Sequence, residues 1–350
     1  MKSTVSRAFK STLALFCALV MFAGCVTREP DNIRQNDFYA GNVWTDMAFY
    51  DVFLSGDLFL DMNLHTTFGI EAVRLTAPGA PFHIPMPSAP GSSRAENEFA
   101  VIDYSNASDG YVMIKYPGQA GQIVPVYVMV PNAGAPYMYL FATTGDFEII
   151  PLSDGNGEYT VALGELLPDG KFAPFNMATF NAVLSDPFAP FLRPNRLVNY
   201  TLDTKVVKIA QDLIGGQTGL VERVKTIYNY VVDHFEYDYD LAANPPKGYV
   251  PDLDYVLDYG KAICYGYAGV MAAMLRSQGI ITKLVFGYMA DGTYHAWIDV
   301  YSDQDGWLSG IVFFDGSGWS LVDPTVASSG GESGEKYFMD NSNYTVHQVY

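Results

Sequence analysis

Three residues in the second half of the chain have side chains suited to covalent catalysis: Cys264, His295 and Asp323. A cysteine thiolate attacks a carbonyl carbon, a histidine holds the thiol proton and passes it to a leaving amine, and a carboxylate orients the imidazole. The sequence presents these residue types in the order nucleophile, base and carboxylate. We therefore predict that they act together as a triad on an amide or peptide bond.

Cys264 opens a predicted helix that ends near Gly279. Unpaired backbone N–H groups and the helix dipole favour an anion at such a position, and thus the thiolate form of a cysteine. Gly260 and Gly266 flank the thiol and leave room for a substrate carbonyl. Taken alone, Cys264 would more often be a small buried apolar residue, but its two partners favour the nucleophile. Its backbone N–H is the expected oxyanion donor, and the sequence names no second one.

His295 lies in a predicted strand over residues 293–301, whose alternation places it on one face with Trp297 and Asp299. We expect that face to meet the start of the Cys264 helix. Asp299 lies about 13 Å further along the strand, too far to bond the same imidazole. Asp323 is expected in a later strand that pairs beside His295, and its alternative role is that of a turn residue. The other histidines have no comparable setting; they are His65, His83, His234 and His347.

The first 24 residues are typical of a leader that directs export. They combine a basic start, an apolar run over residues 13–23 and small residues at the end. The run is too short to span a bilayer, which needs roughly 20 apolar residues. Phe22-Ala-Gly-Cys25 resembles a bacterial lipoprotein signal, which implies a lipid on Cys25; Phe22 departs from the usual aliphatic residue, so plain secretion is the alternative. We expect an exported chain, lipid-anchored to the cell membrane and facing outside the cytoplasm.

Composition narrows the possible functions. The chain has three cysteines, and Cys17 and Cys25 belong to the leader region, so Cys264 is left as a lone thiol. An exported protein exposes a free thiol to oxidation, so we expect a functional reason for keeping it. The formal net charge is −18 and no basic cluster is present, which excludes nucleic-acid binding. The sequence has no Gly-rich phosphate loop and no clustered Cys/His site, so we expect no cofactor and no metal.

The pattern of apolar residues changes near residue 200, from short strand-like runs to helix spacing. We assign residues 1–24 to a signal peptide, 25–95 to a spacer and a region without an assigned fold, 96–190 to a small all-β, sandwich-like domain, and 195–350 to a catalytic domain. The β-domain is predicted from short aromatic and β-branched runs separated by turn signals. These runs cover residues 111–116, 123–130, 137–143, 147–150, 159–163 and 177–184.

The region after residue 195 is predicted to be α+β, with helices packed on an antiparallel sheet. Apolar residues at helix spacing predict helices over 206–213 and 221–235, before the one that begins at Cys264. Strand-like runs then follow over residues 280–288, 293–301, 311–314 and 320–322.

Four short motifs occur in series: Gly260-Lys-Ala-Ile-Cys264-Tyr-Gly-Tyr-Ala268, Met274-Leu-Arg-Ser-Gln-Gly-Ile280 leading to Gly287, Tyr294-His-Ala-Trp297, and Trp319-Ser-Leu-Val-Asp-Pro-Thr325. Their order resembles the transglutaminase-like superfamily, whose members share a papain-like Cys-His-Asp core. The resemblance covers about residues 195–330, and the preceding β-region is similar to a module of bacterial surface members. It implies Cys264, His295 and Asp323 as catalytic residues and a peptide, protein or peptidoglycan substrate.

Two positions depart from the family pattern. Ala262 stands where the family often has glycine, and Gly266 where it often has an acidic residue. Neither removes a triad member, so we expect both to bear on substrate preference. We interpret the chain as a surface-anchored cysteine-dependent enzyme that cleaves or transamidates a peptide or amide bond, with hydrolysis slightly favoured because water is the default acceptor. The alternative is a non-catalytic cell-surface binding lipoprotein with a vestigial triad.

Overall fold

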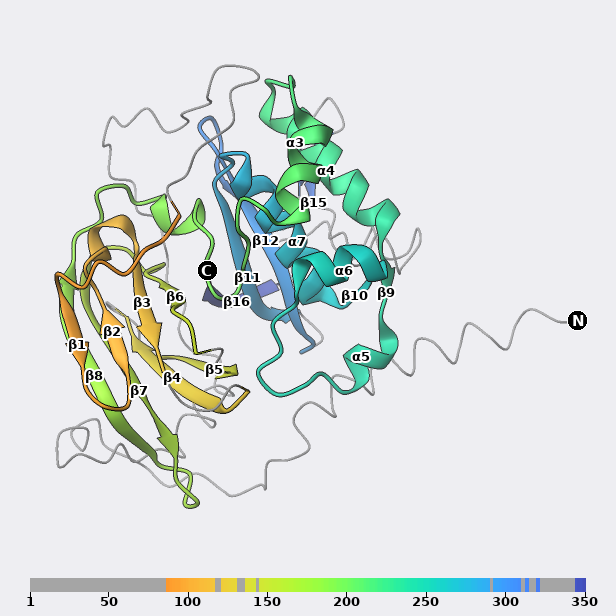
Figure 1. Ribbon diagram of the computed structural model, residues 1–350. Helices are drawn as coiled ribbons and strands as arrows, with labels where there is room; N and C mark the ends of the chain where they lie inside the picture. Colours follow the sequence, from red (N-terminus) through yellow and green to blue (C-terminus); the bar gives the residue numbers. More distant parts are fainter. Residues whose placement is uncertain are drawn as a thin grey trace, which may run out of the picture.

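The computed structural model describes a β-domain followed by an α+β domain (Figure 1). The described residues are 86–116, 121–130, 136–142, 145–289, 292–309, 312–314, 319–321 and 344–350. The predicted signal peptide and most of the spacer, with Cys25, lie outside these residues. Within the described ranges, no helix is long and apolar enough to cross a membrane.

The β-domain consists of two antiparallel sheets, with strand orders β1-β2-β3-β6 and β5-β4-β7-β8. Alternate valines of β4, Val124, Val126 and Val128, are buried in the core, as the period of two in a strand requires. The strands are β1 Arg94–Glu96, β2 Val101–Asp103, β3 Tyr111–Lys115, β4 Ile123–Met129, β5 Tyr137–Ala142, β6 Glu148–Pro151, β7 Gly157–Leu166 and β8 Phe172–Ala182, with short 3-10 turns at η1 Ala107–Asp109 and η2 Ala189–Phe191. The predicted all-β domain is confirmed.

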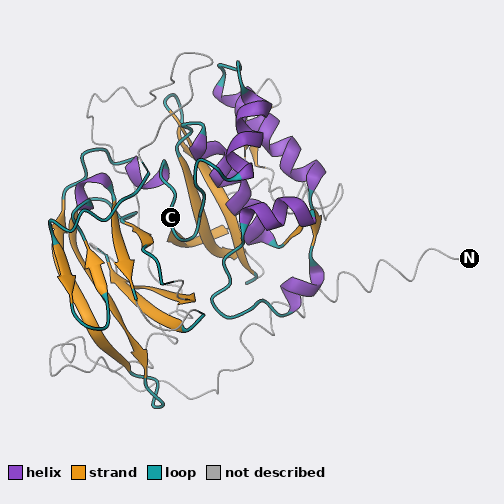
Figure 2. Ribbon diagram, viewed as in Figure 1, coloured by secondary structure: helices purple, strands orange, loops and turns teal. Residues whose placement is uncertain are grey.

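The α+β domain packs its helices on one side of an antiparallel sheet of order β13-β12-β11-β16 (Figure 2). The helices are α3 Lys205–Ile214, α4 Leu220–His234, α5 Tyr239–Ala243, α6 Leu253–Tyr259 and α7 Cys264–Ser277. The sheet strands are β11 Thr282–Met289, β12 Tyr294–Ser302, β13 Gly306–Leu308 and β16 Tyr344–Val349. Two small pairs complete the fold: β9 Glu236–Tyr237 with β10 Lys261–Ala262, and β14 Val312–Phe314 with β15 Trp319–Leu321.

The two faces of the sheet have different neighbours. Ala296, Ile298 and Val300 belong to the buried cluster that contains α7. The opposite face meets the connection between the domains, where the Tyr301 ring lies 4.5 Å from that of Phe188. The expectation that the His295 face packs on the Cys264 helix was therefore wrong, because alternation places the imidazole with Trp297 rather than with Ala296.

Most regular elements agree with the sequence prediction, and several short ones were missed. Residues 206–213 and 221–235 form α3 and α4, and the Cys264 helix is α7. Short α6 and the paired β9 and β10 carry too few residues to show a period. The last strand, β16, pairs with β11 from far along the chain, and local sequence cannot reveal such a pairing.

Helix α7 is apolar on all sides and lies at the centre of the domain, where such a helix belongs. A left-handed Gly260, with φ of 69°, ends α6, and an extended Ile263 then begins α7. A Cβ at Gly266 would lie 2.7 Å from the Ala262 Cβ, closer than real Cβ atoms approach. The two departures from the family pattern thus form one packing unit: the Ala262 methyl group occupies the space that a side chain at position 266 would need.

A buried guanidinium joins α7 to the rest of the domain. Arg276 is completely buried, and its Nε donates to the carbonyl of Thr282 at 2.8 Å. Its Nη1 and Nη2 donate to the carbonyls of Arg193 at 3.0 Å and Tyr350 at 2.6 Å. Burial lowers the pKa of Arg276 to about 10, which still leaves it charged at neutral pH. One side chain therefore connects α7 to β11, the interdomain connection and the residue after β16.

We predict that Arg276→Met lowers the free energy of unfolding by about 3 kcal/mol or more, because three buried carbonyls lose their donor. Urea unfolding of the full chain measures the change. Arg94, exposed and paired only with Glu96 at the surface, provides the control. Arg94→Met should change stability by less than about 0.5 kcal/mol. Equal stability of the two variants would contradict the role of Arg276.

A double-mutant cycle tests the Ala262–Gly266 unit. Gly266→Ala should destabilise by about 1–3 kcal/mol through overpacking, despite the helix propensity gained. Adding Ala262→Gly should recover at least about 1 kcal/mol as coupling. Gly269→Ala in the same helix meets only ordinary contacts of 3.5 Å or more and should be neutral or stabilising. Additive single effects in thermal unfolding would show that the two positions do not share a space.

Candidate active site

The Cys264 thiol lies at the first residue of α7, as predicted. The Ile263 carbonyl accepts hydrogen bonds from the N–H groups of Gly266 at 2.8 Å and Tyr267 at 3.2 Å, which closes the first turn. Cys264 itself is only partly buried and packs against the hydrophobic core. A thiol at this position combines the anion-favouring end of a helix with access from outside.

Aromatic side chains surround the thiol. The Tyr265 ring lies edge-on to Phe286 of β11 at 4.9 Å, and Phe286 stacks on Tyr294 of β12 at 6.1 Å. Tyr249 lies edge-on to Tyr265 from the other side, at 6.1 Å. Burial raises the pKa of Tyr294, and negative charge on Tyr288 and on Cys264 raises it further. Cys264 and the start of β12 are therefore close enough to interact electrostatically.

His295 is the second residue of β12 and pairs with Gly287 of β11. Its side chain is buried, with ring centroids 6.4 Å from Trp297 and 6.5 Å from Tyr344. Its chain neighbour Tyr294 interacts with Cys264. The structure therefore brings the start of β12 close to the thiol, but it places the His295 side chain on the face of the sheet opposite to the one that packs on α7.

The carboxylate of the predicted triad, Asp323, lies outside the described residues. The strand that precedes it, β15, pairs with β14 and not with β12, which differs from the expected pairing. Asp299 is buried opposite Lys283 of β11. Burial lowers the pKa of Lys283, and the Asp299 charge opposes that shift. Asp299 therefore interacts electrostatically with Lys283 on the neighbouring strand.

Sequence reasoning overlooked two residues near this site. His347 of β16 lies 6.0 Å from the Tyr288 ring and 6.4 Å from the Tyr294 ring, and burial lowers its pKa. Tyr249 interacts electrostatically with Cys264 from a loop. Neither has a local signal, because β16 and the loop approach the thiol only through the tertiary fold. Tyr294 belongs to the Tyr294-His-Ala-Trp297 motif, but no role was predicted for it.

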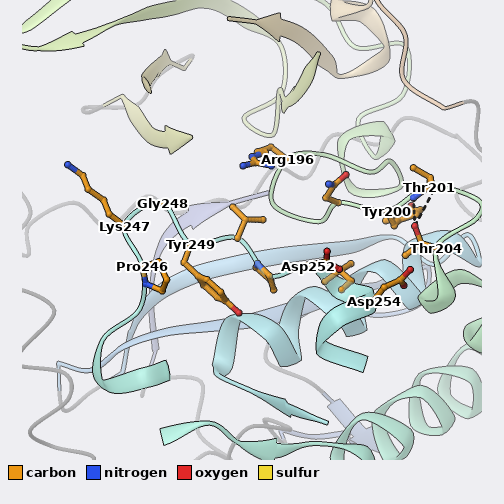
Figure 3. A pocket seen from close by; sticks show the side chains of 14 residues that line it. Arg196, Tyr200, Thr201, Thr204, Pro246, Lys247, Gly248, Tyr249, Asp252 and Asp254 are labelled. Carbon is orange, nitrogen blue, oxygen red and sulfur yellow. Dashed lines mark hydrogen bonds between the residues drawn. The ribbon is translucent and has the colours of Figure 1, made fainter. Parts of the chain in front are cut away.

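A cavity of about 500 Å³ opens beside this cluster, between the segments 196–204 and 246–254 (Figure 3). Its polar rim carries Arg196 and Lys247 as well as Asp252 and Asp254. Arg196 pairs with Glu148 of the β-domain, Nε to Oε2, at 3.1 Å. The full lining is Arg196, Asn199, Tyr200, Thr201, Thr204, Pro246, Lys247, Gly248, Tyr249, Val250, Pro251, Asp252, Leu253 and Asp254.

The carboxylates of the cavity have structural partners. Asp252 caps α6 by accepting from the Tyr255 N–H at 3.0 Å, and Asp254 accepts from the Lys205 N–H at 2.8 Å. Across the described ranges, no group of three or more His, Cys, Asp or Glu side chains is arranged to hold a metal ion. The cavity is thus a polar cleft with an aromatic wall, and Tyr249 is the residue that belongs to both the cleft and the surroundings of the thiol.

Known proteins resemble parts of this chain. Kyphoscoliosis peptidase of Mus musculus is 29% identical over 129 residues, which are 37% of this chain and 19% of that protein. A protein-glutamine gamma-glutamyltransferase of Pseudomonas aeruginosa is 35% identical over 69 residues, 16% of this chain and 10% of that protein. The chain thus spans about a fifth of the length of one curated relative and a tenth of the other.

Solved structures resemble this chain more distantly. A candidate cysteine protease from Cytophaga hutchinsonii is 15% identical, with 74% of this chain and 73% of that chain covered and a TM-score of 0.35. A structure described as a TGase is 19% identical, with 43% and 41% covered and a TM-score of 0.25.

The model of a protein family described as the transglutaminase-like superfamily matches residues 207–310. The match includes Cys264 and His295 and ends before Asp323. It confirms the resemblance inferred from the motifs over the helices and the central strands. Residues 207–310 are thus similar to the transglutaminase-like superfamily.

Proposed function

We propose that the chain is a cysteine-dependent acyl-transfer enzyme that cleaves or transamidates a peptide or amide bond through Cys264, His295 and Asp323. The observation that carries this proposal is the Cys264 thiol at the start of α7, close to Tyr294, the residue before His295. The relatives include a peptidase and a glutamyltransferase, which supports acyl transfer as the shared step.

In the proposed reaction, His295 accepts the Cys264 proton and the thiolate sulfur forms a bond to the substrate carbonyl carbon. The carbonyl π electrons move to oxygen, and the Cys264 N–H stabilises the resulting oxyanion. When the oxyanion collapses, the C–N bond breaks and the amine leaves with the proton held by His295. Asp323 orients the imidazole and stabilises its charged form.

The thioester then passes its acyl group to a second nucleophile. Water gives a carboxylic acid, with His295 taking one water proton and returning it to the leaving thiolate. An amine gives a new amide by the same route. We favour hydrolysis slightly, because water needs no binding site of its own. The expected substrates are peptides, proteins or peptidoglycan.

The location of the enzyme is a second part of the proposal. The leader and the Phe22-Ala-Gly-Cys25 sequence support export and a lipid on Cys25. The polar residues that follow would separate the catalytic domain from the membrane surface. An anchored enzyme of this kind would meet substrates outside the cytoplasm.

The triad assignment predicts that Cys264→Ala and His295→Ala each reduce turnover by at least about 10³-fold. Turnover is measured as ammonia release from a glutaminyl dipeptide and as cleavage of peptide and peptidoglycan fragments. Iodoacetamide should also label Cys264 near neutral pH faster than it labels a free peptide thiol.

His347→Ala distinguishes the roles of His295 and His347, which both lie near the start of β12. If this variant loses turnover while His295→Ala keeps it, the base is misassigned. Unchanged turnover in Cys264→Ala, or labelling of Cys264 no faster than that of a peptide thiol, would contradict the mechanism.

The anchor predicts that cells expressing the full chain incorporate radiolabelled palmitate into it and hold it in the membrane fraction. Cys25→Ser should abolish the label and release the protein, because the thiol is the attachment point. Cys17→Ser, in the same leader region, should leave both unchanged. An unlabelled wild-type chain in the soluble exported fraction would show plain secretion instead.

A further inference from the structure

Tyr249 is held in a fixed loop between the two domains. The loop follows Pro245 and Pro246, and the Tyr249 N–H donates to the Pro246 carbonyl at 3.0 Å. Gly248 has a φ of 71°, and a Cβ there would lie 2.5 Å from the Leu140 carbonyl oxygen of β5. The loop therefore packs directly on the β-domain, which limits the positions that the Tyr249 ring can take.

The Tyr249 side chain belongs both to the lining of the cavity and to the surroundings of the thiol. It lines the cavity, and it lies edge-on to Tyr265, the residue after Cys264, with 89° between the ring planes. In Figure 3 the side chain extends from its loop toward the helices. Among the residues that line the cavity, Tyr249 is thus one that interacts with Cys264.

The hydroxyl group of Tyr249 is available to a ligand. Three neighbouring tyrosines use theirs inside the fold: Tyr200 donates to Leu192, Tyr265 to Leu197 and Tyr267 to Phe235, at 3.3, 3.0 and 3.0 Å. By contrast, no residue of the described segments hydrogen-bonds the Tyr249 hydroxyl. Burial raises the pKa of Tyr249 to about 12, with smaller effects from the charges of Asp238 and Cys264. The phenol therefore keeps its proton at neutral pH and can donate it in a hydrogen bond.

We propose that the Tyr249 hydroxyl donates the second hydrogen bond to the oxyanion formed on the substrate carbonyl, together with the Cys264 N–H. This inference rests on the proposed acyl transfer at Cys264. When sulfur bonds to the carbonyl carbon, the π electrons move to oxygen, and a fixed donor beside the sulfur stabilises that charge more than the neutral carbonyl. No proton is transferred from Tyr249, so its hydroxyl is unchanged when the carbonyl re-forms.

Tyr294, the other tyrosine that interacts with Cys264, is less suited to this role. Its ring packs against Phe286, Tyr288 and His347 on the sheet, and it does not line the cavity. Tyr249 approaches from the side on which the cavity opens. Both tyrosines thus interact with Cys264, but Tyr249 lines the cavity and Tyr294 packs on the sheet.

The test compares a reaction that creates an oxyanion with one that does not, both at Cys264 in the full chain. p-Nitrophenyl acetate acylates the thiol through an oxyanion and releases p-nitrophenolate in a measurable burst. Iodoacetamide alkylates the same sulfur by displacing iodide and forms no oxyanion. Tyr249→Phe should slow the Cys264-dependent burst about 100-fold. Its iodoacetamide labelling rate should stay within about twofold of wild type.

Tyr259→Phe is the matched control, because Tyr259 is exposed at the end of α6 and stacks only on Tyr255 among the described rings. It should leave both rates and the thermal unfolding midpoint unchanged. An unchanged burst in Tyr249→Phe would overturn the inference. Equal slowing of burst and labelling would also overturn it, because Tyr249 would then act on the thiol or the loop. A wild-type chain without a Cys264-dependent burst, labelled no faster than a peptide thiol, would refute the acyl-transfer function itself.

Discussion

The buried guanidinium of Arg276 is the constraint on which the α+β domain depends. A fully buried cation is tolerated only where its donors are satisfied, and here three backbone carbonyls accept them. These carbonyls come from β11, the connection after the β-domain and the end of the chain segment that forms β16. Because Arg276 lies near the C-terminal end of α7, fixing it also fixes the axis that carries Cys264 at the other end.

The β-domain takes part in the architecture of the site. The Arg196–Glu148 pair and the contact of Gly248 with Leu140 hold both cavity-lining segments against β-domain strands. The ring of Tyr350, which follows β16, packs on Tyr137 and Tyr139 of β5 at 5.7 and 5.6 Å. The β-domain therefore helps to position the segments that line the cavity, although the family match covers only the second domain.

Much of the fold could be predicted because long elements carry their own period. Strands β3 to β8 and helices α3, α4 and α7 show it, and their bounds differ from the prediction by a few residues. The short α6 and β13 and the distant β16 could not be predicted, since few residues or a remote partner define them. The face of β12 that packs on α7 could not be predicted either. Alternation of side chains separates the two faces of a strand but does not indicate which face a helix covers.

The sequence by itself determined which residues are suited to catalysis and how they are ordered. They are a lone thiol at a helix start and a histidine on a strand, within motifs that resemble the transglutaminase-like superfamily. Tertiary structure decided which groups gather around that thiol. It brought Tyr249 from a loop and Tyr294 from β12, neither of which lies near Cys264 in sequence, and it placed His347 of β16 beside Tyr294. It also gave Ala262 and Gly266 a shared packing role, because a departure from a motif acquires a cause only when the atoms that compete for one space are known.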